Sequence, residues 1–143
     1  SSSMFLLRAS APFLELGIDP AVVVVGSKNV PAPGRAAAAY SVAKAGLTQL
    51  ARIAALEMAA TGIRVNTVHP NAVFDTGVWT DEVLAGRAAR YGLTVEEYKT
   101  SNLLGAEVRA RDVARMVAAM AGPLFAKTTG AQVPVDGGTE RVV

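Results

Sequence analysis

The sequence of 143 residues contains 51% hydrophobic and 18% charged residues, and its formal net charge is only +2. This small and scattered positive charge, together with an aromatic content of 6%, argues against a nucleic-acid-binding protein. Because the chain has no cysteine and a single histidine, we expect no disulfide, no thiolate nucleophile and no metal site.

No apolar run approaches the length of about 18 residues that a membrane-spanning helix needs. The N-terminal stretch carries neither the basic leader nor the ordered small-residue cleavage site of a signal peptide. We therefore expect a soluble cytoplasmic protein with no membrane partner.

The first half of the chain predicts a helix, a buried strand and a longer helix. Apolar residues recur at helical spacing over residues 3–16. The four valines within residues 21–27 do not alternate with polar residues, which indicates a strand buried on both faces of a parallel sheet. Prolines and a glycine mark a loop over residues 29–34, and the helical pattern returns over residues 36–61.

The second half repeats this alternation of strands and helices. Residues 63–70 are rich in β-formers, residues 71–79 read as a loop, and residues 80–101 as short charged helices. Residues 109–122 form an amphipathic helical pattern, and residues 131–138 predict a short strand that enters a glycine turn. Short strands separated by helices predict an α/β fold with a doubly wound parallel sheet.

Polar residues with acid–base chemistry lie where such a fold binds its ligands, beyond the carboxyl ends of the strands. Ser27 follows the first predicted strand, and a loop begins after Pro70 at the end of the second. Tyr40 and Lys44 are four residues apart, so they share one face of a helix. A tyrosine hydroxyl normally titrates near pH 10, and a neighbouring ammonium favours its ionised form. The three side chains predict a site that moves a proton on or off a carbinol oxygen.

Each of these features also has a simpler interpretation. A tyrosine and a lysine four apart on a helix are usually a solvated pair, and a serine after a strand is usually a turn residue. His69 is expected to be structural, and Asn66 is expected to fix loop geometry at the strand end rather than to act in catalysis. The two glycines at residues 137–138 then only form a tight turn.

Three motifs together resemble the short-chain dehydrogenase/reductase family. The first is GSKNVPAPGRAAAAYSVAKAGL, in which thirteen positions separate Ser27 from Tyr40 and Lys44 follows. GIRVNTVHP is similar to the family's strand with an Asn-x-x-x-Pro element, and TTGAQVPVDGG to its C-terminal signature. The resemblance implies a Rossmann-type fold and hydride transfer between a nicotinamide cofactor and a small-molecule alcohol or aldehyde.

The resemblance also implies a role for each catalytic residue. Tyr40 is the acid/base, and Lys44 favours its ionised form and binds the hydroxyls of the nicotinamide ribose. Ser27 orients and polarises the substrate oxygen.

A cofactor loop is implied after the second strand. Pro70 and Asn71 belong to it, and the backbone of Val73 binds the nicotinamide carboxamide. Asn71 stands where most of the family has glycine, so we expect the loop geometry to differ. The family's glycine-rich nucleotide-binding turn and its catalytic asparagine are not in this sequence. Residues 1–143 therefore resemble the C-terminal half of a Rossmann-type domain, and we expect them to be part of one.

A finer resemblance lies in GSKNVPAPG, in residues 69–104 and in GPLFAKTTGAQVPVDGG. These stretches are similar to the dehydrogenase half of bifunctional rhamnulose-1-phosphate aldolase/alcohol dehydrogenases. The resemblance implies an aldolase domain upstream in the parent chain, a role in rhamnose metabolism, and lactaldehyde as the substrate. NAD is the cofactor expected for this oxidation, with NADP left open.

Two alternatives stay open. In the family, the helices that match residues 3–16 and 36–61 commonly build a four-helix dimer interface, which predicts a homo-oligomer. One alternative is a truncated, catalytically inactive chain that chiefly self-associates. The other keeps the chemistry and changes the substrate to another carbonyl, such as a sugar or an acyl thioester.

Overall fold

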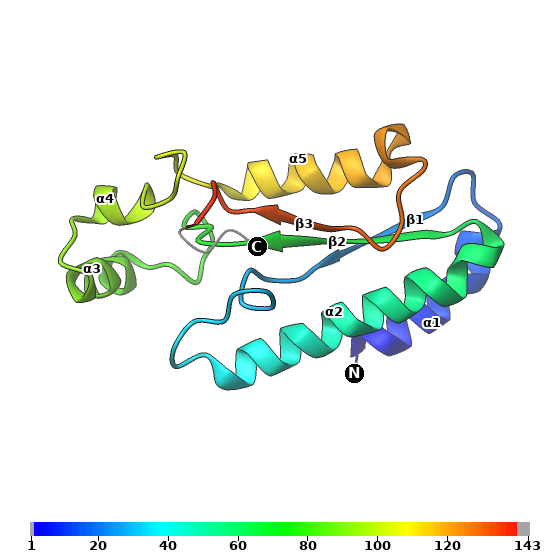
Figure 1. Cartoon of the computed structure of the whole chain (residues 1–143), viewed down its shortest axis with the longest axis horizontal. Coiled ribbons are helices and arrows are strands. Elements are labelled where there is room, and N and C mark those ends of the chain that lie inside the picture. Colours follow the sequence, from blue (N-terminus) through cyan, green and yellow to red (C-terminus); the bar gives the residue numbers. More distant parts are fainter. Residues whose placement is uncertain (1, 140–143) are drawn as a thin grey trace.

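A computed structural model describes residues 2–139, and its centre is a three-stranded parallel sheet (Figure 1). The sheet order is β1-β2-β3, and β2 lies in the middle with all but its last residue buried. The strands are β1 (Ala21–Val25), β2 (Arg64–Pro70) and β3 (Gln132–Val135). The predicted α/β fold with a parallel sheet is confirmed.

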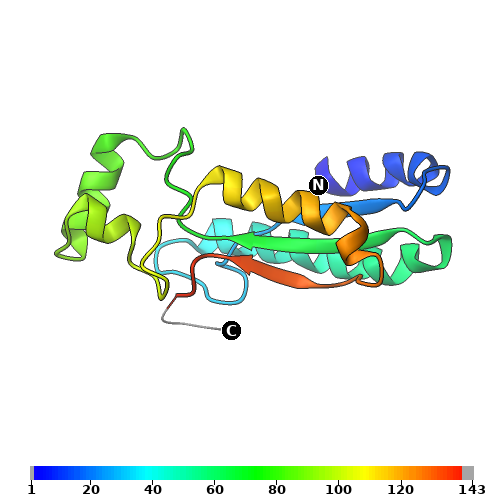
Figure 2. The same cartoon turned by 90° about the horizontal axis from the view of Figure 1, so that it is seen from above.

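Helices cover both faces of the sheet. On one face lie α1 (Ser2–Glu15) and α2 (Ala38–Met58), the latter followed by the short helix η1 (Ala59–Thr61). On the other face α5 (Ala110–Ala121), followed by η2 (Pro123–Phe125), contacts all three strands. Figure 2 shows α5 lying across the sheet when the molecule is seen from that side.

The main core lies between α2 and the sheet. Three small residues of α2, Ala51, Ala54 and Ala55, pack with Ile63 and Val65 at the start of β2. Their helical spacing places them on one stripe of α2, and their size lets the helix backbone approach the strands closely. Leucines of α1 and valines of β1 pack against the edge of this cluster.

Two short helices lie beyond the carboxyl ends of the strands (Figure 1). They are α3 (Asp81–Arg90) and α4 (Val95–Lys99). Thr80 caps α3 by accepting a hydrogen bond from the backbone of Val83, and Thr94 forms a reciprocal capping box with Glu97 at α4. No helix within residues 2–139 is long and apolar enough to cross a membrane.

Several boundaries differ from the sequence-based predictions. The helix predicted from residue 36 begins at Ala38, because Ala36 has a φ of +59°, which a right-handed helix cannot contain. The prediction that residues 131–138 form a short strand entering a glycine turn is confirmed, because β3 ends at Val135 and Gly137 turns the chain with a φ of +67°.

The prediction that β1 is buried on both faces is wrong. Its residues are half-buried, and Val25 is 47% exposed. The cause is its place at the edge of the described sheet, where β2 is its single neighbouring strand. Regular pairing ends at Val25, two residues before the predicted end at Ser27.

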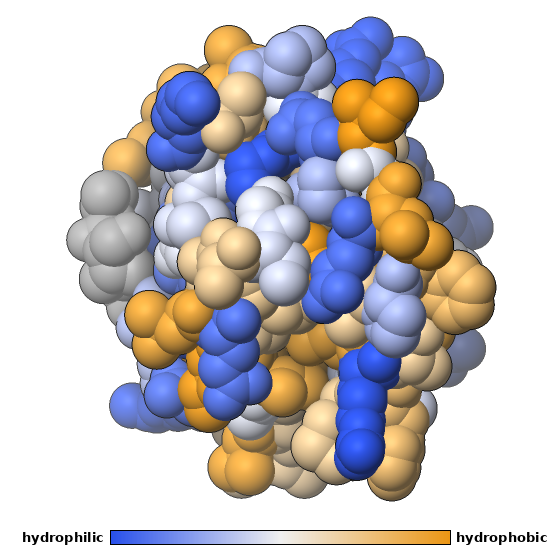
Figure 3. Space-filling view, turned by 90° about the vertical axis from the view of Figure 1, so that its right-hand side faces the viewer, coloured by the Kyte–Doolittle hydropathy of each residue, from blue (hydrophilic) through white to orange (hydrophobic). Residues whose placement is uncertain are grey.

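Large apolar side chains are exposed on α1 and α2. Figure 3 shows one end of the molecule, where apolar residues reach the surface and are interspersed with charged ones. The most exposed on the two helices are Phe5, Leu6, Phe13, Val42 and Leu56, each 66% exposed or more.

Candidate active site

Ser27 is buried in the loop that follows β1. Its backbone N–H donates a hydrogen bond to Nδ1 of His69 over 3.1 Å. Its hydroxyl oxygen accepts a hydrogen bond from the backbone N–H of Asn29 over 3.2 Å. Because a hydroxyl both donates and accepts, this arrangement leaves the hydroxyl hydrogen of Ser27 able to donate to a substrate oxygen.

The ends of β1 and β2 stay joined beyond their last regular pair. The backbone N–H of Gly26 donates to the carbonyl of Val68 over 2.8 Å, and that of Lys28 donates to the carbonyl of Pro70 over 3.0 Å. The loop of Ser27 therefore lies beside the start of the loop that follows Pro70, at the edge where parallel sheets bind ligands.

The face of α2 that carries Tyr40 and Lys44 meets the end of β1. Nζ of Lys44 donates a hydrogen bond to the carbonyl of Val25 over 3.0 Å and lies 5.9 Å from the centroid of the Tyr40 ring. Tyr40 is half exposed, and within the described residues it makes no hydrogen bond to Ser27. The structure thus brings Lys44 to the strand end that precedes Ser27, with Tyr40 beside Lys44 at the surface.

The loop after β2 has a constrained backbone. The N–H of Asn71 donates to the carbonyl of Val135 over 3.2 Å, and the carbonyl of Val73 accepts from the hydroxyl of Thr76 over 3.0 Å. Asn71 occupies the position where a glycine was expected from the resemblance, yet the left-handed residue of this loop is Ala72, with a φ of +53°. An alanine in that region is strained by about 1 kcal/mol.

The residues at this edge fit the nicotinamide-ribose end of a dinucleotide. The ammonium of Lys44 has three N–H donors, and the carbonyl of Val25 takes one of them. The remaining donors can bind vicinal hydroxyls, and the half-exposed Tyr40 lies next to them.

Lys28, the residue after Ser27, forms a buried ion pair with Asp136 that was not predicted from the sequence. Nζ of Lys28 lies 2.9 Å from Oδ2 of Asp136, and the side chains are 6% and 7% exposed. The geometry is that of a close ion pair rather than of an aligned hydrogen bond. Lys28 and Asp136 lie far apart in the chain, so neither helical nor strand periodicity could predict the pair.

The glycines after Asp136 do more than form a turn. The carbonyl of Gly138 accepts from the backbone N–H of Leu103 over 2.7 Å. A Cβ atom on Gly137 would lie 2.5 Å from the side chain of Asn102, so a larger residue cannot fit there. This turn therefore holds the segment that follows α4.

Four aromatic rings hold the segment between β2 and α5. Phe74 contacts Trp79 with ring centroids 4.9 Å apart, and Tyr98 with centroids 5.3 Å apart. Tyr91 stacks on Tyr98. Burial raises the pKa of Tyr98 above its usual value, and the nearby Tyr91 adds to this effect. Tyr98 is therefore a neutral structural side chain at neutral pH.

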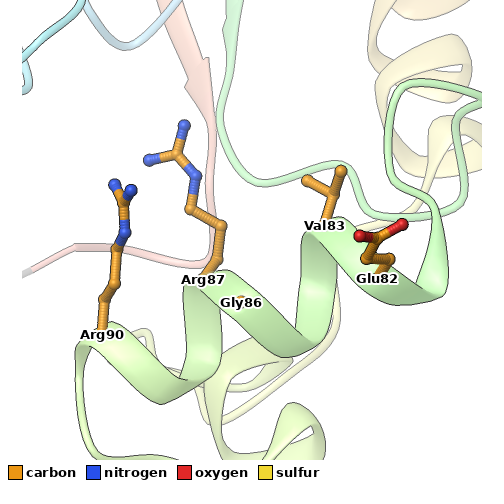
Figure 4. Close-up of a pocket in the computed structure, with 5 residues that line it drawn as sticks. All are labelled: Glu82, Val83, Gly86, Arg87 and Arg90. Carbon is orange, nitrogen blue, oxygen red and sulfur yellow. The ribbon is translucent and has the colours of Figure 1, made fainter.

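Two cavities of the described residues lie away from the three candidate side chains. One cavity of about 220 Å³ lies on α3 (Figure 4), and another of about 370 Å³ lies between the Ser27 loop, α2 and β3. Neither is lined by Ser27, Tyr40 or Lys44. In Figure 4 two arginines extend from the same side of α3, and the lining residues are Glu82, Val83, Gly86, Arg87 and Arg90.

The interpretation of Asn66 as a residue that fixes loop geometry is confirmed, although Asn66 lies inside β2 rather than at a strand end. Its side chain is buried, and Nδ2 donates to the carbonyl of Thr128 over 2.9 Å. Its Oδ1 accepts from the backbone N–H of Ala131 over 2.9 Å. One side chain thus fixes the turn that leads into β3.

Comparisons with known proteins find relatives over most of the chain. The family model described as enoyl-(acyl carrier protein) reductase matches residues 1–140. The chain is 40% identical over 122 residues to the uncharacterized oxidoreductase YuxG of Bacillus subtilis, a match that covers 82% of this chain and 18% of YuxG. It is 32% identical over 124 residues to 2,3-dihydro-2,3-dihydroxybenzoate dehydrogenase of Escherichia coli, covering 83% of this chain and 48% of that protein.

Solved structures also match most of the chain. A short chain oxidoreductase from Pseudomonas aeruginosa with NADPH bound superposes with a TM-score of 0.81 at 33% identity, over 96% of this chain and 52% of that one. A sorbitol-6-phosphate 2-dehydrogenase from Erwinia amylovora superposes with a TM-score of 0.82 over 95% of this chain and 55% of that one; at 23% identity it shows the fold alone. The chain thus spans about half the length of most of these proteins, and less than a fifth of YuxG.

Proposed function

This chain belongs to the short-chain dehydrogenase/reductase family, and on that premise we propose that it provides the proton-transfer side of a nicotinamide-dependent oxidoreductase site. The hydrogen bond from Lys44 to the carbonyl of Val25 is the observation that carries this proposal. It joins the helix face that carries Tyr40 to the strand end that precedes Ser27, which supports a site built from these three residues of one motif.

In this proposal each residue has one task. In the oxidation direction Tyr40, in its ionised form, accepts the proton of the substrate hydroxyl, and in the reduction direction its hydroxyl returns it. The positive charge of Lys44 favours the ionised form, and its free N–H donors hold the ribose hydroxyls. The hydroxyl of Ser27 donates to the substrate oxygen and fixes its direction.

The nicotinamide ring, when bound, supplies or accepts the hydride. The loop of Pro70, Asn71 and Val73 borders the site, and we propose that its backbone binds the carboxamide. NAD is the proposed cofactor, and NADP is the alternative.

We propose lactaldehyde as the substrate and the cytoplasm as the place of action. The match to YuxG supports a parent chain with a second domain, because the matched segment makes up only 18% of that relative. For oxidation to the acid, the hydrated aldehyde presents the hydroxyl. It loses one hydride from carbon and one proton to Tyr40, and the carboxylic acid is formed.

The test uses the complete gene product that carries this segment. It is incubated with lactaldehyde and NAD, and the appearance of NADH is followed by absorbance. We expect lactaldehyde to turn over faster than a cyclic alcohol. Faster turnover of the cyclic alcohol would overturn the proposed substrate but not the proposed hydride-transfer reaction. No turnover of any alcohol or aldehyde would overturn the function.

The variant Tyr40→Phe tests the acid/base role. It removes one hydroxyl oxygen from a half-exposed side chain, so the fold should not change. We expect kcat to fall by about 10²- to 10⁴-fold, because this is the usual contribution of a general acid or base. The matched control is Tyr91→Phe, which lies outside the site, and an unchanged kcat in Tyr40→Phe would contradict the assignment.

Self-association is the second candidate property, and the exposed apolar side chains of α1 and α2 favour it. Phe5, Leu6 and Phe13 on α1 and Leu56 on α2 are each 66% exposed or more. Such an outer face is typical of a surface that packs against a second copy.

A further inference from the structure

His69 lies directly beneath the candidate serine. It is on β2, and its side chain is 3% exposed. One ring nitrogen, Nδ1, accepts the backbone N–H of Ser27 over 3.1 Å. The other, Nε2, lies 2.7 Å from Oε1 of Gln132 on β3.

These two contacts determine where the proton of the ring is. An N–H of the backbone can only donate, so Nδ1 must carry a lone pair. The hydrogen is then on Nε2, which donates to Oε1 of Gln132. Gln132 therefore fixes the tautomer that lets His69 bind Ser27.

The ring also packs on the backbone just before Ser27. A Cβ atom on Gly26 would lie 2.6 Å from Nδ1 and 2.7 Å from Cε1 of His69. A glycine is therefore required at residue 26, and the imidazole has no room to move toward the loop. The position of the Ser27 backbone is thus set both by a hydrogen bond and by contact.

We propose that His69, neutral and protonated on Nε2, is a positioning residue that holds Ser27 in place for the reaction. The inference rests on the proposed function, in which the hydroxyl of Ser27 orients the substrate oxygen. His69 does not reach the substrate itself, because its two nitrogens bind Ser27 and Gln132.

Two neutral variants of similar size separate this role from simple packing. In His69→Asn, Oδ1 stands at the position of Nδ1 and keeps an acceptor for the N–H of Ser27. In His69→Gln, the amide reaches the position of Nε2 and keeps a contact with Gln132 but loses that acceptor. Both remove the ring, so a purely structural role predicts similar effects.

The experiment measures kcat and KM for lactaldehyde with NAD in the complete gene product. We expect His69→Asn to keep kcat within about threefold, and His69→Gln to lose about 10- to 100-fold in kcat with a smaller change in KM, because misplaced catalytic groups cost rate. Equal losses in both variants, or no loss in His69→Gln, would overturn the proposal.

A second measurement does not depend on activity. Hydrogen–deuterium exchange of the Ser27 amide should be slow in the wild type and in His69→Asn, and about 10- to 100-fold faster in His69→Gln. If the wild type turns over no substrate, the proposed function fails. The exchange rates still decide whether His69 holds Ser27, and equal rates in all three proteins would reject it.

Discussion

The serine loop shows how single residues from distant parts of the chain hold a candidate site. His69 on β2 binds the backbone of Ser27, and Asp136 after β3 binds the side chain of Lys28. A buried ion pair is costly to form, because both charges lose water. Removing only one partner costs more, because the other charge is then left buried and unpaired.

We expect Lys28→Met to lower the free energy of unfolding by about 3 kcal/mol, because Asp136 is then left buried without a counter-charge. The double variant Lys28→Met with Asp136→Leu should recover a large part of this loss. Urea denaturation measures both, and the exposed Lys127→Met is the matched control, with a change of less than about 0.5 kcal/mol expected. Equal losses in the single and double variants would show that the unpaired charge of Asp136 is not what destabilises Lys28→Met.

Among the elements, α5 depends on a side chain from β2. Arg64 is 6% exposed, and its Nη1 donates to the carbonyls of Met120 and Phe125, each over 3.0 Å. Its Nη2 donates to the carbonyl of Ala121 over 3.2 Å and pairs with Asp19. A cation at the C-terminal end of a helix is favoured by the helix dipole and satisfies carbonyls that lack intrahelical partners.

We expect Arg64→Met to lower the free energy of unfolding by about 3 kcal/mol, because the buried carbonyl of Met120 and the part-buried carbonyls of Ala121 and Phe125 lose their donor. Asp19→Asn should cost less than about 1 kcal/mol, because Asp19 is 48% exposed and water replaces the ion pair. Thermal unfolding followed by circular dichroism compares the two. If Asp19→Asn lowered the free energy of unfolding more than Arg64→Met, the ion pair rather than the bonds to the carbonyls would be the main stabilising contact of Arg64.

The order and type of the elements could be predicted from the sequence, because each has its own hydrophobic period. Residues 63–70 and 109–122 were placed within a residue of β2 and α5. The start of α2 was missed because the left-handed conformation of Ala36 leaves no mark on an alanine-rich pattern.

Fewer of the contacts at the candidate site could be predicted from the sequence. Local spacing placed Tyr40 and Lys44 on one face, and the structure agrees, with Nζ of Lys44 5.9 Å from the Tyr40 ring. The contact of His69 with Ser27 and the pair of Lys28 with Asp136 could not be predicted, because they join residues that only the folded sheet brings together.

At the scale of the whole molecule, the outer faces of α1 and α2 carry many of the exposed large apolar side chains of the described residues. Both are turned away from the sheet and expose large apolar side chains, as described above. Packing them against the same helices of a second copy would remove that surface from water, which is favourable by about 25 cal/mol per Å² of apolar area.

We expect the complete gene product to form at least a dimer, and Leu56→Glu to shift it toward the monomer, because a buried carboxylate opposes association. The mass in solution is measured by light scattering over a range of concentrations. The control is Leu124→Glu, which is equally exposed but lies in η2, on the other side of the sheet. A monomeric wild type would contradict self-association through these helices.

The contact between Gly26 and His69 couples the residue types that these two distant positions can accept. Any side chain at residue 26 would collide with the imidazole, and a smaller residue at 69 would leave a gap over the backbone. A side chain can therefore be added at residue 26 only in a protein in which His69 has been replaced, whereas His69 can be replaced while Gly26 is kept. The same contact predicts how the segment can diverge: a substitution at Gly26 becomes acceptable only after His69 has been replaced.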